Sequence, residues 1–471
     1  MKRSRSEYPL YFAFVAVLLL FGLFSVTGCE GDTAAVTGSI TVPDDYTSIQ
    51  DAIDAAEDGD VIVVKPGKYS GSIDFNGKNI TLSSTNPEDP EIVATTIIDA
   101  GGVNSVVAFK NGETEAAVIT GFTITGGSGN LETLEFIIEG EAQELPSYYG
   151  GGLIILNGSS PTITGNVIVD NVAERGGAIL SYGSSPIITD NKIDDNISTG
   201  GGGGIFLADS SATMINNTMA NNVAGLSGGA VAITGSADLP SLIEGNTFSN
   251  NRADNGGAFS IFESDPEIKN NTLLNNFSTQ AGGGIFMVSS SAVLTNNDIT
   301  DNIAGNAGGG IAVYFESAPL IENNTIIGNE ANDGGGLSIY YASTPLISGN
   351  TITDNQARIG GGIEVNEGSS PEIRDNDLSG NYAEVGGGGL LVHLAEALVS
   401  GNTFSNNESR REGGAIYLFV DAVGKVYSNV FESNKSIEGG AIYVDEGGTL
   451  ELNDPDDNTY RDNAPDDIAR F

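Results

Sequence analysis

The stretch GGGIAVYFESAPLIENNTIIGNEAND, residues 308–333, contains the pattern that decides the fold. It opens with glycines followed by an apolar residue, and its second half carries two asparagines, Asn324 and Asn329. The four-residue word Gly-Gly-(Gly or Ala)-apolar recurs twelve times, at spacings of 26 to 28 residues. Its apolar residues are Leu153, Ile179, Ile205, Val231, Phe259, Ile285, Ile311, Leu337, Ile363, Leu390, Ile416 and Ile442. Self-similarity at this period indicates a solenoid whose repeats stack on one another.

Each repeat is best explained by short strands. Apolar residues alternate, as at Ile311 and Val313, which is typical of strands with one buried face. Glycines at every period would destabilise helices, and Ser-Ser-Pro words such as 159–161 and 369–371 mark turns. Leucine-rich repeats have a similar period, but their Leu-x-x-Leu-x-Leu pattern is missing. We therefore predict an all-β, single-stranded parallel β-helix with three strands per coil, about 26 residues per coil and about 14 to 15 coils.

A second word, Asn-x-apolar-x-x-Asn, follows the glycine word in every repeat, from Asn166/Asn171 to Asn458/Asn463. Successive coils of a β-helix lie about 4.8 Å apart, so like residues stack on like. Stacked asparagines can hydrogen-bond along the axis and satisfy groups that the strands leave open. We predict that these asparagines are structural rather than catalytic.

The region before the repeats contains one predicted helix. Thr47 or Ser48 can cap it, Ile49 and Ile53 fall on its apolar face with Ala56, and Gly59 ends it. Such a helix would close the open end of the solenoid and protect its edge.

The same region closely resembles the N-terminal sequence of pectin-lyase-like right-handed β-helix proteins. The resemblance rests on Ile-Gln-x-Ala-Ile-x-x-Ala from residue 49, Gly-Asp at 59–60 and Pro-Gly-x-Tyr at 66–69, and with the repeats it covers about 39–463. The words Gly413–Ile416 and Phe404–Asn407 also resemble those of polymorphic outer-membrane proteins. These resemblances imply a right-handed β-helix and say little about activity.

The first residues are predicted to be a targeting signal. Lys2, Arg3 and Arg5 precede an apolar run, and Val26-Thr-Gly-Cys29 resembles the lipobox of bacterial lipoproteins. The resemblance implies cleavage before Cys29, the only cysteine, and acylation of that residue. Because Glu30 rather than Asp follows, it also implies export to the outer membrane or cell surface, with the membrane contacted only through the lipid anchor.

The chain is accordingly divided into five segments. They are a signal peptide (1–28), the acylated cysteine with its tether (29–38), a cap with irregular coils (39–149), regular repeats (150–463) and a C-terminal tail (464–471). An insertion at 128–149, rich in glutamate, interrupts the rhythm before the first regular coil. It is either a solvated flap or a loop that covers a groove or holds a cation.

Composition excludes several functions. The chain has 19 Lys+Arg against 62 Asp+Glu, a formal charge of −43, which disfavours nucleic acid as a partner. One Cys and one His exclude disulfide frameworks and cysteine- or histidine-rich metal centres. No cofactor is predicted, although Ca²⁺ remains an option for the acidic segments.

Strand alternation predicts which side chains leave the core. The residue three after each repeated apolar residue should point outward, and this row contains Phe262, Tyr314, Tyr340, Asn366, His393 and Phe419. A second outward row, one residue after the apolar residue, contains Phe206, Phe286, Glu364, Tyr417 and Tyr443. Aromatic rings in a line suit the apolar faces of sugar rings, and neighbouring polar groups suit their hydroxyls. We predict a binding surface made of Tyr314, Tyr340, Glu364, Asn366, His393, Phe262 and Phe419.

Catalytic residues are harder to assign. The Gly-His-Gly of polygalacturonases is absent, and the residue set of pectin methylesterases cannot be placed. The candidates are Glu364, His393 and Arg358. The alternatives are that His393 is a surface histidine without a role and that Arg358 forms a salt bridge. We therefore expect a lipid-anchored surface protein that interacts with polysaccharide or cell-surface glycan, or is adhesin-like. The alternatives are a polysaccharide lyase or hydrolase and a structural spacer without ligand.

Overall fold

The computed structural model describes residues 39–138, 141–235, 240–453 and 457–471. The predicted signal peptide (1–28) and the segment 29–38 with Cys29 lie outside the described residues. Within those ranges, no helix is both long enough and apolar enough to cross a membrane.

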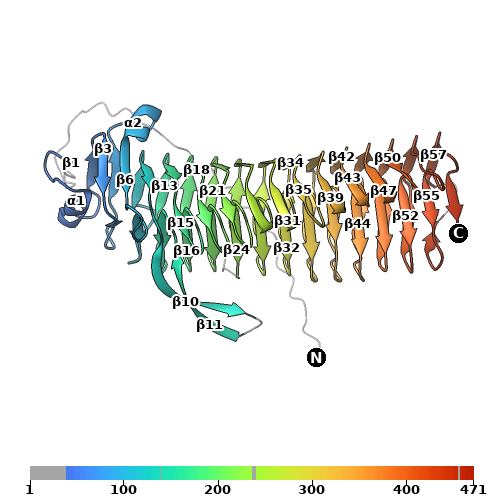
Figure 1. Cartoon of the computed structure of the whole chain (residues 1–471), viewed down its shortest axis with the longest axis horizontal. Coiled ribbons are helices and arrows are strands. Elements are labelled where there is room, and N and C mark those ends of the chain that lie inside the picture. The colour runs from blue at the N-terminus through green and yellow to red at the C-terminus, as the bar shows by residue number, and fades with distance from the viewer. Residues whose placement is uncertain (1–38, 139–140, 236–239, 454–456) are drawn as a thin grey trace, which may run out of the picture. The chain divides into compact units, whose positions relative to one another are not determined.

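The described residues form the predicted parallel β-helix (Figure 1). Sheet A has 16 strands, from β1 (Ser39–Val42) to β56 (Thr449–Glu451), and sheet B has 15, from β3 (Gly67–Ser70) to β57 (Thr459–Arg461). Sheet C also has 15 strands. The sixteen strands of sheet A slightly exceed the 14 to 15 coils expected from the sequence, because the irregular region 39–149 contributes complete coils of its own.

A fourth sheet adds to the three predicted ones. It has ten strands, from β15 (Val172–Ala173) to β51 (Glu408–Ser409), and each lies between a strand of sheet B and one of sheet C. The chain therefore runs through sheet A, sheet B, the fourth sheet and sheet C in ten successive coils.

Sheet C positions the site described below. Its strands are β4 (Ile73–Asp74), β7 (Val107–Phe109), β12 (Leu153–Ile155), β16 (Ile179–Tyr182), β20 (Ile205–Ala208), β24 (Val231–Thr234), β28 (Phe259–Phe262), β32 (Ile285–Val288), β36 (Ile311–Tyr314), β40 (Leu337–Ile339), β44 (Ile363–Asn366), β48 (Leu390–His393), β52 (Ile416–Phe419), β55 (Ile442–Val444) and β58 (Ile468–Arg470). The last of these, β58, lies within the predicted tail and pairs with β55.

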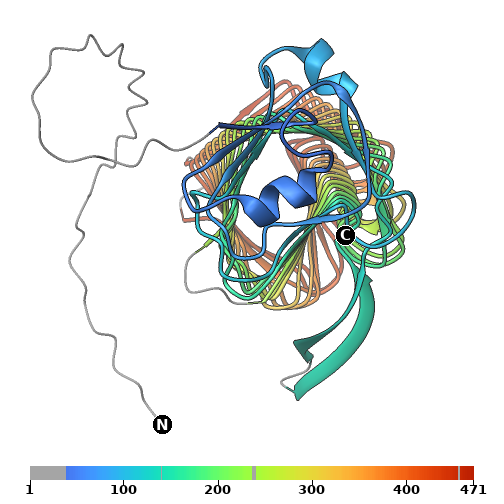
Figure 2. The same ribbon diagram turned by 90° about the vertical axis from the view of Figure 1, so that its left-hand side faces the viewer.

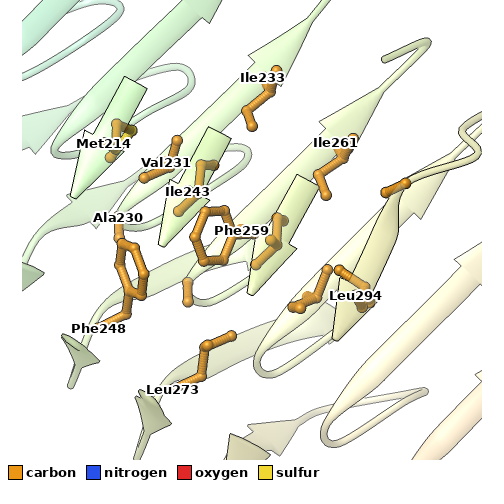
Figure 3. Close-up of a cluster of buried hydrophobic side chains, with 14 of the residues drawn as sticks. Met214, Ala230, Val231, Ile233, Ile243, Phe248, Phe259, Ile261, Leu273 and Leu294 are labelled. Atoms are coloured by element: carbon orange, nitrogen blue, oxygen red, sulfur yellow. The ribbon is translucent and has the colours of Figure 1, made fainter. Parts of the chain in front are cut away.

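The coils stack in register. Ile311 pairs with Leu337 and Leu337 with Ile363, so the repeated glycine words lie directly above one another. Their apolar residues point into a continuous core that runs the length of the solenoid. Figure 3 shows part of this core, where the rings of Phe248 and Phe259 meet edge to face at 4.5 Å between centroids.

The asparagines form two ladders, as predicted. One occupies the corner between sheets A and B and the other the corner between sheet B and the fourth sheet. In the second ladder, Asn329 accepts hydrogen bonds from the backbone N and Nδ2 of Asn302, at 2.9 and 3.0 Å. Its own Nδ2 donates to the Ile299 carbonyl at 2.9 Å and to Asn355 Oδ1 at 3.0 Å. Each buried amide thus joins three coils.

The glycine word marks a close approach of backbones. A Cβ on Gly309 would lie 2.4 Å from the carbonyl oxygen of Gly335 in the next coil. Gly308 has a φ of 65°, in the left-handed region that glycine adopts without strain. Both requirements are steric, so these glycines are structural.

Helix α1 (Ile49–Ala55) closes the first coil, as predicted (Figure 2). Ser48 is its N-cap and accepts a hydrogen bond from the Asp51 N–H, while Ile49, Ala52 and Ile53 are buried. The helix ends at Ala55, before the predicted stop at Gly59. A second short helix, α2 (Pro90–Thr95), was not predicted and has Asp89 as its N-cap.

The insertion at 128–149 forms the antiparallel hairpin β10 (Asn130–Ile138) and β11 (Glu141–Tyr149), which projects from the solenoid (Figures 1 and 2). Leu134 and Phe136 of β10 and Tyr149 of β11 are buried against Ile154, Leu180 and other outer residues of sheet C. The insertion therefore covers the outer face of the first regular coils and is not simply a solvated flap.

Of the two predicted outward rows of sheet C, the one that directly follows the repeated apolar residue is mostly buried. Leu180, Ser338 and Glu364 are fully buried, and Leu391 is 1% exposed. The other row stays largely half-exposed, and its Phe262 is 43% exposed. The hairpin covers the outer face at one end of the repeats, and farther along Ile359 packs against the cluster of Leu391, Tyr417 and Tyr443. Covering segments therefore bury part of the face that the sequence predicts to point outward.

The asparagine ladder yields a stability prediction. Asn329→Ala should remove the four hydrogen bonds that its side chain makes to Asn302, Ile299 and Asn355, at a cost of roughly 1–3 kcal/mol for each buried group that stays unpaired. The thermal unfolding midpoint, followed by circular dichroism, should fall sharply. Asn332→Ala is the matched control, because Asn332 is exposed in the same coil and makes one hydrogen bond to the Gly305 carbonyl. Equal midpoints for the two variants would contradict the structural role of the ladder.

Candidate functional site

A cavity of about 510 Å³ opens on the outer side of sheet C. Its base comes from β44, β48 and β52 together with Tyr340, which directly follows β40. The remaining lining comes from the ends of β39 (Glu330–Asp333), β43 (Gln356–Ile359) and β47 (Tyr382–Gly386), and from Arg411 and Glu412. The lining residues are Asp333, Tyr340, Arg358, Ile359, Glu364, Asn366, Val385, Leu391, His393, Arg411, Glu412, Tyr417 and Phe419.

Glu364 is the buried polar centre of this cavity. It is fully buried, and its carboxyl is surrounded by polar side chains from two coils. Tyr340 OH donates to Oε1 at 2.8 Å, Asn366 Nδ2 lies 3.2 Å from Oε1, and Ser338 Oγ lies 3.3 Å from Oε2. In-register stacking creates this arrangement, because Ser338 and Glu364 are paired neighbours in sheet C.

Burial raises the pKa of Glu364 to about 8, with the negative charge of Asp333 adding to the effect. The hydrogen bonds from Tyr340, Asn366 and Ser338 act in the opposite direction and are outweighed. The carboxyl is therefore mainly protonated at neutral pH, and it can then both donate and accept a hydrogen bond.

A second carboxyl, Asp333, lines the same cavity. Burial raises its pKa, and the nearby Arg358 guanidinium, 3.0 Å from Oδ1, opposes that rise. Arg358 thus forms a salt bridge with Asp333, which is the alternative role that the sequence offered for it. The pKa of Glu412 is also raised by burial, so three carboxyl groups with raised pKa values line one cavity.

His393 lies half-buried on β48, with its ring 4.8 Å from that of Phe419. Burial lowers its pKa, which favours the neutral imidazole at neutral pH. Tyr417, on the next strand, donates a hydrogen bond to Asp445 at 3.1 Å. These rings make one side of the cavity aromatic.

An exposed aromatic pair lies beside the cavity. Phe315 and Tyr341 occupy the corner between sheets C and A in consecutive coils, with their rings stacked at 4.5 Å and 11°. They are 48% and 38% exposed. Tyr314 and Tyr340 pack against them from within, and Tyr340 in turn contacts Glu364.

The backbone at this pair follows the repeat. Phe315 has a φ of 53° and Tyr341 a φ of 57°, in the left-handed region that bulky residues usually avoid. The equivalent corner has a positive φ in other coils too, where it holds Gly183, Asp209 or Leu394. The conformation therefore belongs to the corner, and what distinguishes these two coils is the pair of aromatic rings placed there.

Most of the predicted binding residues meet in one place. Tyr340, Glu364, Asn366, His393 and Phe419 line the cavity, as does the weak catalytic candidate Arg358. Tyr314 does not line it, but its ring lies 5.2 Å from that of Tyr340. Phe262 lies on β28, four strands before β44 in sheet C, and lines a different cavity.

Sequence reasoning missed Phe315, Tyr341, Asp333 and Glu412. The sequence did contain a pattern that marks the aromatic pair: Phe315 directly follows Tyr314 of the outer row, and 26 residues later Tyr341 directly follows Tyr340. No sequence pattern marks the missed charged residues, because their position over sheet C depends on where the strands of the fourth sheet end. Among the described residues, no group of three or more His, Cys, Asp or Glu side chains is arranged to hold a metal ion.

The buried carboxyl predicts a pH dependence of stability. The pKa of Glu364 is about 8 in the folded state and 4.5 ordinarily, so the folded protein keeps a proton that the unfolded chain releases. The free energy of unfolding should therefore fall as pH rises through this window. Glu364→Gln should remove this contribution, so the variant should gain stability relative to wild type between about pH 5 and about pH 8.5. Denaturant unfolding at both pH values measures the gain.

Glu367→Gln, an exposed change in the same coil, serves as the control and should follow the wild-type pH dependence. A Glu364→Gln variant that tracks wild type at every pH would show that this carboxyl titrates normally.

Known proteins resemble the chain only distantly. No curated protein is significantly similar to the chain in sequence. Among solved structures, XylC in complex with xylose matches with a TM-score of 0.38 at 11% identity, over 90% of this chain and 86% of that one. The receptor-binding tailspike protein of bacteriophage Det7 matches with a TM-score of 0.34 at 13% identity, over 83% and 74%. A Yersinia enterocolitica family 28 exopolygalacturonase matches with a TM-score of 0.20 at 12% identity, over 91% and 78%. Similarity this low assigns neither ligand nor activity.

The family comparison is decisive for the architecture. The sequence model of the family described as "Right handed beta helix region" matches residues 104–240, 229–397 and 284–464, which together span well over half of the chain. These are the residues that form the stacked coils, the asparagine ladders and the cavity around Glu364. The chain therefore belongs to the right-handed β-helix family.

Proposed function

We propose that the cavity around Glu364 and the exposed pair Phe315–Tyr341 form a carbohydrate-binding site. The observation that carries this proposal is the pair itself: two stacked, exposed rings beside a polar cavity. Aromatic faces bind the apolar faces of sugar rings, and a few fixed polar groups bind the hydroxyls.

The polar groups near the pair suit a sugar. The Asn366 amide and the Tyr340 hydroxyl line the cavity and can donate or accept hydrogen bonds, while the fully buried Glu364 holds them in place. Their positions are fixed, because the three side chains already bond to one another. A preorganised polar site loses little entropy when a ligand binds.

The charge of the protein bears on which glycan binds. A net charge of −43 repels polyanions, which favours neutral glycans, or acidic ones only through bridging calcium. Arg358 and Arg411 line the cavity, but Asp333, Glu364 and Glu412 line it too. The cavity itself therefore offers no strongly positive surface.

Retention on immobilised polysaccharides tests the proposal. The double variant Phe315→Leu/Tyr341→Leu keeps apolar side chains and removes both rings, so retention should weaken about tenfold. Leu394→Ala is the matched control, since Leu394 is 43% exposed and has a φ of 50° at the equivalent corner but carries no ring. Tyr314 and Tyr340 are unsuitable probes, because their rings support the exposed pair from within.

Neutral and acidic polysaccharides should be tested with and without calcium. Wild-type retention that the double variant matches would place the binding surface elsewhere. Wild-type protein that is retained on none of the matrices would favour a structural spacer.

A polysaccharide hydrolase or lyase is the second candidate function, and Glu364 favours it. A carboxyl that stays protonated at neutral pH can act as a general acid toward a glycosidic oxygen, and other carboxyls lie in the same cavity. Reducing-end or unsaturated products, assayed in the same tubes, distinguish the two functions. An enzyme centred on Glu364 should lose product formation but keep retention in Glu364→Gln.

We also propose that Cys29 carries a lipid anchor that holds the solenoid at the bacterial surface. The proposal rests on the lipobox-like sequence before the only cysteine. Cys29→Ser should leave the protein unacylated and move it from the detergent phase to the aqueous phase. Unchanged partition, with an unchanged N-terminal mass, would contradict the anchor.

A further inference from the structure

A second cavity, of about 500 Å³, lies under the hairpin β10–β11. Phe136 and Leu145 of the hairpin line one side. The outer face of sheet C lines another, with Phe206 on β20, Ala232 on β24 and Phe286 on β32. Most of this lining is apolar and aromatic, unlike the lining of the cavity around Glu364.

One cation, Arg175, lines this cavity. Its guanidinium lies 5.4 Å from the ring centroid of Phe136, 5.9 Å from that of Phe206 and 6.0 Å from that of Tyr149. Its Nη1 donates to Tyr149 OH at 3.4 Å. The three rings hold the guanidinium between the hairpin and the sheet, which is a fixed position for a long side chain.

Arg175 has no ion-pair partner among the residues that the structure describes. This is notable in a chain where acidic residues outnumber basic ones by 62 to 19. The carboxylate of the adjacent Glu174 accepts hydrogen bonds from Ser147 Oγ and the Tyr148 N–H, which lower its pKa. The charge of Arg175 also helps to lower the pKa of Glu174, but Arg175 forms no ion pair with it. Glu263 is the one carboxylate in the cavity lining, and it is exposed. It follows β28, whereas Arg175 precedes β16, and these two strands lie three positions apart in sheet C.

A guanidinium has five N–H donors in a planar fork that matches a carboxylate. In Arg175 only one of them has a partner within the described residues, and that contact is long. The remaining donors stand beside apolar walls in which an anionic group would be weakly hydrated. An electrostatic contact with an anion is stronger there than on an open surface.

We propose that this cavity binds a small amphiphilic anion, whose anionic group pairs with Arg175 while its apolar body lies among Phe136, Phe206 and Phe286. A fatty acid and an aryl carboxylate share this chemistry. The site is separate from the carbohydrate site, because the two cavities have no lining residue in common. It does not depend on the proposed carbohydrate function.

The full chain suits a fluorescence test, because it contains no tryptophan and a naphthyl probe can be read without indole emission. The probes are 2-naphthoate and its neutral counterpart 2-naphthalenemethanol, with decanoate as an aliphatic competitor. Wild-type protein should bind 2-naphthoate at least about tenfold more tightly than the alcohol, since only the anion pairs with Arg175. Displacement of 2-naphthoate by decanoate would show that the cavity also accepts an acyl chain. Lack of displacement would restrict the site to aryl anions.

Arg175→Gln should abolish the preference for the anion, and Arg175→Lys should keep part of it. Arg252→Gln is the matched control, because Arg252 also lies over a ring, that of Phe277 at 4.8 Å, but does not line the cavity. Unfolding midpoints show whether each variant keeps its fold. Ala232→Leu, which narrows the cavity without changing charge, should weaken both probes. Equal affinity of wild type for acid and alcohol, binding of neither, or an unchanged preference in Arg175→Gln would each overturn the proposal.

Discussion

Every structural feature of this protein depends on the stacking of each coil on the next at the distance of one strand. At that spacing, equivalent residues of successive coils are direct neighbours. Each residue must therefore pack or hydrogen-bond favourably with the equivalent residue of the next coil as well as with its own coil. Apolar residues meet this condition in the core and asparagines meet it at two corners, where one amide can satisfy another through many coils. Glycine meets it where a Cβ would strike the next backbone, as at Gly309. The repetition in the sequence is the direct consequence.

The same constraint leaves freedom where neighbouring coils do not share a role. The outer side of sheet C is such a place, because it is covered by different segments along its length. The hairpin covers the first regular coils, and residues such as Ile359 cover later ones. Both cavities lie on this face. Each contains aromatic rings together with charged residues at positions where the sequence departs from the repeat. Glu364 and Arg175 are examples, since they occupy positions that hold apolar or small residues in many other coils.

The repeat made the fold predictable and left the site partly hidden. The strands, the core residue of each coil, the asparagine ladders and the Ser48 cap follow from local pattern, which stacking then repeats. The cavity residues Tyr340, Glu364, Asn366 and His393 were also predicted, because alternation places them on one face of consecutive strands. Their burial was not predictable, since Ser338 and Glu364 are covered by segments from other corners of the coil. Phe315 and Tyr341 were missed because an aromatic residue at a left-handed corner contradicts the usual turn preferences.

The central claim is that covering segments turn an outward row of a regular sheet into a buried site with altered chemistry. The protonation state of Glu364 reports this burial most directly. Infrared difference spectroscopy of the carboxyl band, assigned by its loss in Glu364→Gln, would measure its midpoint in the folded protein. The structure predicts a midpoint near 8. A midpoint near the ordinary value of 4.5 would mean that water reaches the carboxyl, and it would contradict the buried site on which this account rests.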